Sequence, residues 1–511
     1  MTESNALPKF PESYWMDSVH GMTSFPKLSQ SIDTEAVVVG GGISGITTAY
    51  LLAKSGLKVV LLEADKLLNG TTGHTTAKIT SQHDLIYDKL MKNAGKEKAA
   101  LYYQANRDAM HFILQTIEQY DMNCGLSVED AYIFTNSVDY IPDLESEMNA
   151  YSALGIEGKF VDSIPLSIPA KAAVRMNKQA QFHPLRYLST LIREIIKDGV
   201  DIYEGTTAVD IQKGTLPQVI TSEGHKVTCK YVVSCSHFPF YDGGGFYFAR
   251  MYAERSYVLG VETGAEFPGG MYISAEEPKR SIRSAVMEDG AMLLLIGGQS
   301  HKTGQGICTI NHYEMLGQYA VRHFQLQEVA YRWSAQDLIT GDDIPYIGRI
   351  TESSPNIFVA TGYKKWGMTS GTAAAMLISD LIMERQNPYE QLFAPSRSMS
   401  LGTIKNLAVE NADVAKHLIA GKLGMIYRNL EELGKDEGGI VRVQGRRAGA
   451  YRDSEGKLHL VDTTCTHLGC EVEWNDGDRT WDCPCHGSRF SISGEVIEGP
   501  ADKPLKSIKK K

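Results

Sequence analysis

Two short segments near the C-terminus bring together residue types that bind metals. One residue separates Cys465 from His467, and two residues separate Cys483 from His486. Each segment therefore offers one thiolate and one imidazole, a set that suits a [2Fe–2S] cluster with two cysteines on one iron and two histidines on the other. A zinc site is the competing interpretation, although zinc modules usually place two to four residues between paired ligands.

Residues 465–470 and 483–488 together resemble the complete Rieske signature. The resemblance implies that these two cysteines and two histidines bind the cluster, that Cys470 and Cys485 form a disulfide, and that Ser488 hydrogen-bonds a cluster sulfur. Phe490 stands where high-potential members have tyrosine. Because fewer hydrogen bonds stabilise the reduced cluster less, we expect a potential below that of the respiratory proteins.

A glycine-rich turn marks a second candidate site near the N-terminus. Gly40, Gly42 and Gly45 follow an apolar strand and open a predicted helix, and Glu63 ends the next strand. Backbone N–H groups of such a turn can approach a pyrophosphate, and the carboxylate can accept hydrogen bonds from a ribose. An acid at this position disfavours a 2′-phosphate, which leaves NAD or FAD. A tight-packing turn without a ligand is the alternative interpretation.

Residues 34–387 resemble the D-amino-acid oxidase and glycine oxidase superfamily of flavoproteins, through residues 40–45, 70–77, 343–349 and 360–369. In that family these segments cover the pyrophosphate, ribose and isoalloxazine ring of FAD, so the resemblance implies FAD. The cofactor-binding residues that we expect are Gly40, Gly42, Ser44, Gly45, Glu63, Thr71, Thr72, His74, Gly362, Lys364, Lys365, Gly367 and Met368.

His74 lies in a run that resembles the place where dimethylglycine and sarcosine dehydrogenases attach FAD covalently through histidine. Those enzymes have tryptophan at the position of Gly73. Covalent attachment at His74 and a packed or hydrogen-bonded histidine therefore both remain open.

The combination of the two candidate cofactors predicts an electron converter, because flavin accepts two electrons as a hydride and a [2Fe–2S] cluster carries one. We expect an FAD-dependent dehydrogenase that oxidises a C–N bond of an amine or amino acid and passes electrons through the cluster to an unknown protein. Arginine can clamp a carboxylate, and aromatic rings can enclose an alkylammonium. The candidate substrate residues are Arg283, Arg349, Trp333, Tyr252 and Tyr257.

Three other functions are alternatives to the dehydrogenase. An electron-transfer protein that serves a partner enzyme is the main alternative. A pyridine-nucleotide-linked reductase should contain a second Gly-x-Gly-x-x-Gly unit, and we find none in the sequence. A Rieske oxygenase requires a mononuclear iron held by two histidines and a carboxylate, and no such triad is visible.

The strands and helices that we expect around these residues indicate an α/β fold. We expect a Rossmann-like FAD-binding domain with an antiparallel-sheet substrate subdomain, followed by an all-β Rieske domain. The expected divisions are an N-terminal extension over 1–33, the flavin domain over 34–394 with a substrate lobe at about 84–178 and 246–330, a helical linker over 395–423, and the Rieske domain over 424–511.

Composition and charge argue against two kinds of partner, nucleic acid and a membrane that the chain would span. The chain has 511 residues, of which 43% are hydrophobic, and its net charge is −10 with scattered basic residues, which argues against nucleic acid. No apolar run approaches the roughly 20 residues that span a bilayer. The first 15 residues have neither the basic nor the apolar region of an export signal, so we expect the protein to be cytoplasmic.

Overall fold

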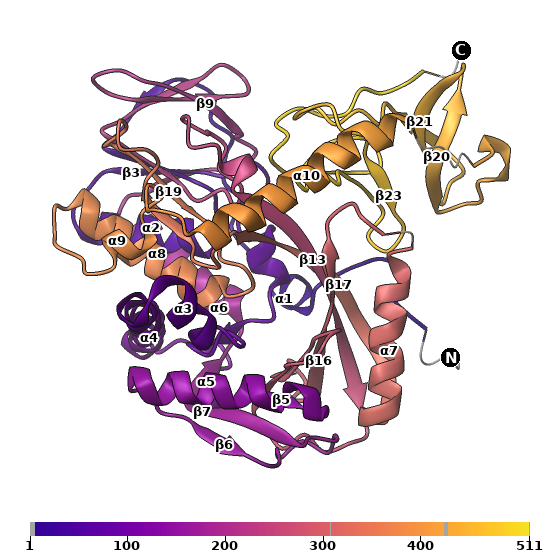
Figure 1. Cartoon of the computed structure of the whole chain (residues 1–511). Helices are drawn as coiled ribbons and strands as arrows, with labels where there is room; N and C mark the ends of the chain where they lie inside the picture. The colour runs from indigo at the N-terminus through magenta and orange to yellow at the C-terminus, as the bar shows by residue number, and fades with distance from the viewer. Residues whose placement is uncertain (1–5, 307, 424–427, 510–511) are drawn as a thin grey trace.

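The computed structural model describes residues 6–306, 308–423 and 428–509 (Figure 1). The predicted β-α-β unit is present as β2 (Ala36–Val39), α2 (Ile43–Lys54) and β3 (Val59–Leu62). Every residue of β2 and β3 is buried, as expected for central strands that are covered on both faces.

These strands belong to a six-stranded sheet with the order β18-β19-β12-β2-β3-β8. Five neighbouring strands run parallel, and β18 pairs with β19 in the antiparallel direction at the edge. This arrangement confirms the Rossmann-like prediction. The other strands of the sheet are β8 (Asp201–Tyr203), β12 (Tyr231–Ser234), β18 (Tyr346–Arg349) and β19 (Ile357–Thr361).

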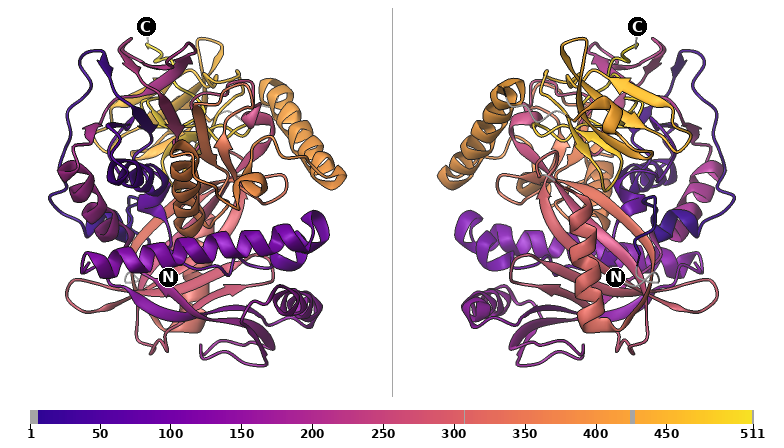
Figure 2. Two further views of the ribbon diagram at one scale, coloured as in Figure 1. Left: turned by 90° about the vertical axis from the view of Figure 1, so that its left-hand side faces the viewer. Right: turned by 90° about the vertical axis from the view of Figure 1, so that its right-hand side faces the viewer.

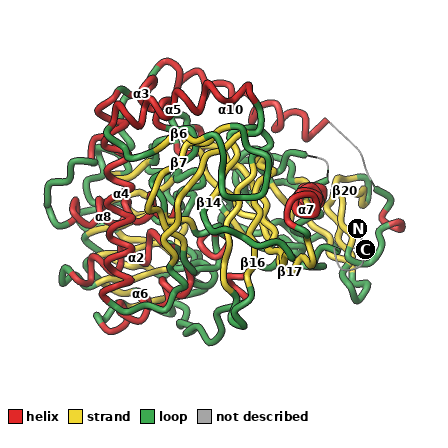
Figure 3. The backbone as a smooth tube through the Cα atoms, turned by 90° about the horizontal axis from the view of Figure 1, so that it is seen from below, coloured by secondary structure: helices red, strands yellow, loops and turns green. Residues whose placement is uncertain are grey.

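Helices gather beside this sheet (Figure 3). Helix α2 contacts both α6 and α8, and α8 also contacts α4. Almost every residue of α8 is buried, and its small side chains let the neighbouring elements pack closely around it. The bounds of the helices before α10 are α1 (Tyr14–Asp17), α3 (Tyr87–Ala94), α4 (Lys96–Gln119), α5 (Ile141–Leu154), α6 (Pro184–Lys197), α7 (Ile310–Phe324), α8 (Gly367–Ile382) and α9 (Glu390–Phe393).

A nine-stranded sheet forms the second layer, with the order β17-β13-β16-β15-β14-β5-β7-β4 and β6 beside β7. The predicted antiparallel pairing is correct except at one place, where β14 and β5 run parallel. These two strands are far apart in sequence, so no hairpin forces them to be antiparallel. The strands are β4 (Lys78–Ile79), β5 (Ser127–Thr135), β6 (Lys159–Val161), β7 (Ala172–Gln181), β13 (Met251–Thr263), β14 (Met271–Ser274), β15 (Arg280–Val286), β16 (Met292–Lys302) and β17 (Leu326–Thr340).

A small third sheet lies at the outer edge of the flavin domain, in the order β1-β11-β10-β9. Its strands β9 to β11 form an antiparallel meander that β1 joins in parallel. The strands are β1 (Ile32–Asp33), β9 (Ala208–Gln212), β10 (Gln218–Thr221) and β11 (Lys226–Thr228).

Helix α10 (Leu401–Leu423) leads from the flavin domain toward the C-terminal strands (Figures 1 and 2). Lys302 pairs with Glu410 at 2.6 Å and with Asp413 at 2.9 Å, so the helix is fastened to the flavin domain. The expected boundary at residue 424 lies outside the described residues. No helix in the described ranges is long and apolar enough to cross a membrane.

The C-terminal domain consists of two antiparallel sheets, in the orders β20-β21-β22 and β23-β24-β25-β26, which confirms the all-β prediction. Trp481 fills the space between them, and a Cβ on Gly449 of the first sheet would lie 2.8 Å from its ring. The strands are β20 (Glu437–Val443), β21 (Arg446–Arg452), β22 (Leu458–Val461), β23 (Glu473–Asn475), β24 (Thr480–Asp482), β25 (Arg489–Phe490) and β26 (Val496–Glu498).

Candidate functional site

Two loops at one end of the C-terminal domain carry the four predicted cluster ligands. The first loop follows β22, and the amide of Cys465 donates to the carbonyl of Cys470 at 2.7 Å. The second loop follows β24, and the amide of Cys483 donates to the carbonyl of Ser488 at 2.8 Å. The predicted disulfide between Cys470 and Cys485 joins the two loops.

The geometry of the ligand side chains fits a [2Fe–2S] cluster. The rings of His467 and His486 lie 4.9 Å apart, and both Nδ1 atoms are buried with no hydrogen-bond partner among the described residues. Leaving such an atom unpaired costs about 1–3 kcal/mol, so both nitrogens are suited to bind a metal. Burial lowers the pKa of both histidines, that of His486 to about 4, which keeps the imidazoles in the neutral form that ligates iron.

The sulfur atoms at this site are of two kinds. Those of Cys470, Cys483 and Cys485 lie within 4.8 Å of one another, but two of them form the disulfide, so Cys483 is the free thiol of this group. Its hydrogen bond to Cys465 lowers the pKa of Cys465 to about 7 and raises that of Cys483. The two thiols therefore titrate as a pair, and the closeness of the second thiol favours loss of the first proton.

The residues around the ligands include the predicted tuning serine. The side chain of Ser488 helps to lower the pKa of Cys465, and its oxygen accepts from the amide of Ala501 at 3.0 Å. That contact ties the Gly499-Pro500 loop to the second ligand loop. Phe490 is fully buried and packs in the same apolar cluster as the ligand cysteines.

A cavity of about 980 Å³ begins at the glycine-rich turn, and its size is at the upper end of the range for cofactor pockets. Gly40 has a φ of +111°, and a Cβ there would lie 2.5 Å from the carbonyl oxygen of Cys235. A Cβ on Gly45 would lie 1.8 Å from the carbonyl oxygen of Gly40. Only glycine therefore fits at these two positions, and the turn keeps the backbone open for a pyrophosphate.

Side chains from two other segments complete this end of the cavity. Glu63 accepts hydrogen bonds from the amides of Gly41 at 2.7 Å and Asp65 at 2.9 Å, while burial raises its pKa. Thr72 accepts from the amide of Ile43 at 3.1 Å, at the start of α2. The carboxylate, the hydroxyl and the open helix N-terminus together match what a dinucleotide requires.

All predicted cofactor residues line this cavity except Gly45 and Gly362. These two glycines are not part of its lining but pack closely against neighbouring residues. Lys364 and Lys365 reach it just before α8, but neither is free. Lys364 pairs with Asp343 at 3.3 Å, and Lys365 pairs with Glu254 at 2.6 Å.

His74 also lines the cavity, and its Nδ1 lies 2.9 Å from the carbonyl oxygen of Gly70. A Cβ on Gly73 would lie 2.5 Å from the carbonyl oxygen of Leu68, so no larger residue fits beside the histidine. Burial lowers the pKa of His74. His74 is thus within hydrogen-bond distance of the main chain, and covalent attachment of FAD to it stays a prediction.

The predicted substrate residues divide into two groups. Tyr252 and Tyr257, both on β13, line the cavity. Arg283, Arg349 and Trp333 do not, and we therefore assign none of them to the substrate site.

Each of these three side chains is engaged elsewhere. The guanidinium of Arg283 donates to main-chain carbonyls, among them that of Ala77 at 2.7 Å, and it lies over the ring of Trp15. Arg349 pairs with Glu390 at 2.9 Å on the surface. The indole of Trp333 is buried and donates to the carbonyl of His74 at 2.9 Å.

The sequence did not predict that the Rieske domain would line the same cavity. Residues 495–502 form part of its wall, and this segment includes the loop around Pro500. Phe238 also lines the cavity, and its ring centre lies 6.5 Å from that of His467. The ring of Phe248 lies 6.0 Å from that of His486. The cluster histidines therefore face the flavin domain.

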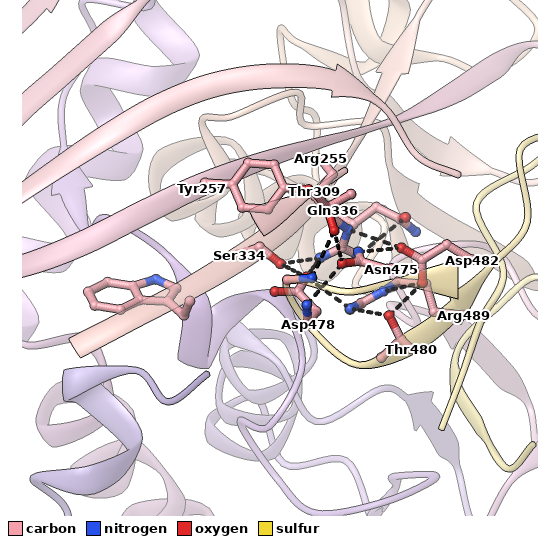
Figure 4. Close-up of polar contacts among 12 residues, drawn as sticks. Arg255, Tyr257, Thr309, Ser334, Gln336, Asn475, Asp478, Thr480, Asp482 and Arg489 are labelled. Carbon is pink, nitrogen blue, oxygen red and sulfur yellow. Dashed lines mark hydrogen bonds and ion pairs between the residues drawn. The ribbon is translucent and has the colours of Figure 1, made fainter. Parts of the chain in front are cut away.

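A buried polar network fastens the two domains together (Figure 4). Arg255 of β13 is fully buried, and it donates to Ser334 at 2.6 Å and to Glu498 at 3.0 Å. Arg489 pairs with Asp478 and with Asp482, each at 3.2 Å. Further contacts cross the interface from Gln336 to the carbonyl of Gly487, from Tyr313 to Asp478 and from Thr309 to Asn475.

Comparison with known proteins identifies both domains. Residues 35–381 match the family described as FAD dependent oxidoreductase (DAO), and residues 425–509 match the Rieske [2Fe-2S] domain. The chain belongs to the DAO family of FAD-dependent oxidoreductases and carries a C-terminal Rieske domain. This result confirms FAD and a [2Fe–2S] cluster as the cofactors.

Three similar proteins illustrate the relationship. YhfW of Bacillus subtilis (strain 168), which carries the name of a Rieske 2Fe-2S iron–sulfur protein, is 49% identical over 508 residues and covers 99% of both chains. Gamma-glutamylputrescine oxidoreductase of Escherichia coli (strain K12) is 23% identical over 396 residues, which cover 74% of this chain and 90% of that protein. The crystal structure of glycine oxidase from Geobacillus kaustophilus has a TM-score of 0.61 at 18% identity and covers 72% of this chain and 100% of its own, which shows a shared fold.

Proposed function

We propose that this chain is an FAD-dependent dehydrogenase that oxidises a C–N bond of an amine or amino acid and exchanges the electrons with its own Rieske cluster. The observation that carries the proposal is the shared cavity, whose wall includes the glycine-rich turn, the sheet strands β13 and β17, and residues 495–502 of the Rieske domain. When bound, FAD accepts a hydride from the carbon next to the substrate nitrogen, and the cluster carries single electrons onward.

The chain's own residues support this function by positioning and by excluding water. Phe238 lines the cavity and also packs against His467, with ring centres 6.5 Å apart, so this side chain lies between the cavity and a cluster ligand. The buried network around Arg255 and Arg489 holds the Rieske domain in one position against β13 and β17. A fixed separation suits transfer within the chain.

The substrate type draws support from the named relatives. Gamma-glutamylputrescine oxidoreductase and glycine oxidase both carry names that point to substrates with a C–N bond. In this chain, Tyr252 and Trp366 line the cavity, and Trp366 stacks on His83 with ring centres 4.6 Å apart. Aromatic walls of this kind suit an alkylammonium.

The test is anaerobic mixing of the purified holoprotein with a panel of N-methylated amines and amino acids. We expect flavin bleaching by at least one compound, followed by the electron paramagnetic resonance signal of the reduced cluster. An external protein would then reoxidise the cluster. Bleaching by none of the compounds, together with rapid reduction by NADPH or a reduced ferredoxin, would instead indicate an electron-transfer protein that serves a partner enzyme.

A further inference from the structure

Most charged side chains in the cavity wall have a partner of opposite charge. This wall is built mainly by β13, β16, β17 and the segment before α8. The pairs are Lys279 with Asp84 at 2.7 Å, Lys365 with Glu254 at 2.6 Å, Lys364 with Asp343 at 3.3 Å, and Lys89 with the same Asp343. Four lysines face three carboxylates in these pairs, so one positive charge is left over, where Lys89 and Lys364 share Asp343.

Asp337 is the exception among the buried carboxylates of this wall. It lies on β17, where Ala335, Asp337 and Ile339 line the cavity while Ser334 and Gln336 contact the other face. Its side chain is 8% exposed, and within the described residues it makes no hydrogen bond or ion pair. A buried carboxylate without a partner is costly, so its oxygens are free to bind a cationic donor from the cavity.

The environment of Asp337 shifts its pKa toward neutral pH. Burial raises the pKa of Asp337 to about 7, Lys365 and Arg255 lower it, and Glu254 and Glu498 raise it. The carboxylate can therefore both attract a cation and accept a proton near pH 7.

Among its described lining residues, the cavity offers no arginine that could clamp a substrate carboxylate bidentately. Lys78 is the lysine without a carboxylate partner, and its ammonium donates to Ser281 at 2.7 Å and to the carbonyl of Tyr272 at 3.1 Å. These two contacts use two of its three N–H donors, while burial and the nearby Arg283 lower the pKa of Lys78 to about 7.

We infer that Asp337 binds the ammonium group of the substrate and accepts its proton, and that the substrate is an amine recognised through its nitrogen rather than an amino acid held by its carboxylate. In this step an N–H bond breaks, its electron pair stays on nitrogen, and the proton forms an O–H bond with the Asp337 carboxylate. The freed lone pair is what the nitrogen needs to form a C=N bond when hydride leaves the adjacent carbon. This inference rests on the proposed function.

The test uses three ions of similar shape in which the carbon that bears the charged group carries no hydrogen, so that none of them can lose a hydride from that carbon. They are tert-butylammonium, pivalate as the anion, and 2-aminoisobutyrate as the zwitterion. Binding to the FAD-loaded full chain is read from the shift of the flavin absorbance spectrum. We expect tert-butylammonium to bind most tightly, and Asp337→Asn to weaken it by about 10- to 100-fold, the effect of one charge-assisted hydrogen bond.

The control is Glu277→Gln, which removes an exposed carboxylate at the rim of the same cavity and should leave the affinity unchanged. A second readout is pH. Protonation of Asp337 removes its charge, so the wild-type affinity should fall as the pH drops through about 7, and Asp337→Asn should show no such fall.

Equal binding by Asp337→Asn and the wild type, or tighter binding of pivalate or the zwitterion, would overturn the inference. So would a failure of the wild type to bind tert-butylammonium. Because the three probes are inert to oxidation, these results do not depend on whether any amine reduces the flavin. Failure of the substrate panel alone would therefore count against the proposed function and not against this site.

Discussion

Arg255 is the residue on which the contact between the two domains depends most. Its guanidinium is fully buried between β13 and the Rieske domain, 3.0 Å from Glu498, 3.6 Å from Asp478 and 4.0 Å from Asp482. Arg489 is the second cation of this network. Replacing Arg255 with methionine keeps most of the volume and removes the charge.

The expected cost follows from the charge count. In the native network two arginines face three carboxylates, and in Arg255→Met a single arginine faces the same three. Removing one partner of a buried ion pair costs about 3–5 kcal/mol, because the remaining charges stay buried without compensation. The cost should appear mainly as weaker docking of the Rieske domain, since Asp478, Asp482 and Glu498 all belong to it.

The assay is urea unfolding of the holoprotein, followed with flavin fluorescence for the first domain and cluster absorbance for the second. In the wild type we expect the two transitions to coincide, because the domains stabilise each other. In Arg255→Met the cluster transition should move to lower urea and separate from the flavin transition. The control is Arg349→Met, which removes an exposed surface pair with Glu390 and should change stability by less than about 1 kcal/mol. Coincident and unshifted transitions in Arg255→Met would refute the reasoning.

Three further predictions follow from the two sites. Gly45→Ala should abolish FAD retention, measured as the flavin-to-protein absorbance ratio, because its Cβ would lie 1.8 Å from the Gly40 carbonyl oxygen; normal retention would contradict the turn geometry. Phe490→Tyr should raise the cluster potential by about 20–65 mV in a redox titration, the value of one added hydrogen bond to the reduced cluster, and no rise would contradict it. Arginine partners lower the pKa of Asp478 and Glu498, so their stabilising effect is complete at neutral pH and is lost as the pH falls through the lowered values; an unfolding midpoint that does not fall in acid would argue against the network.

Local signals in the sequence were sufficient for the cofactor sites. The cluster ligands and the glycine turn are defined by spacing within a few residues, and the strands on either side of the glycine turn and its helix are apolar runs. The substrate residues were harder to predict, because Arg283 looks like an ordinary half-buried arginine in an alternating strand. Only the packed structure reveals that its donors are used by main-chain carbonyls such as that of Ala77.

The interface between the domains could not be predicted, because its contacts join residues that are far apart in the chain. Arg255 and Glu498 are separated by 243 positions, and Ser334 and Asp478 by 144. Asp337 carried a weak signal, as an acid directly before Leu338 and Ile339 near the end of β17. Only the packed structure shows that its carboxylate has no partner among the described residues of the cavity wall.

The most direct test of the central claim is flash photoreduction of the flavin in the anaerobic holoprotein, which needs no substrate. If flavin and cluster exchange electrons within one chain, the cluster should become reduced as the flavin reoxidises. The rate of this step should be independent of protein concentration. A reduced flavin beside a cluster that stays oxidised, or a rate that rises in proportion to protein concentration, would contradict the account.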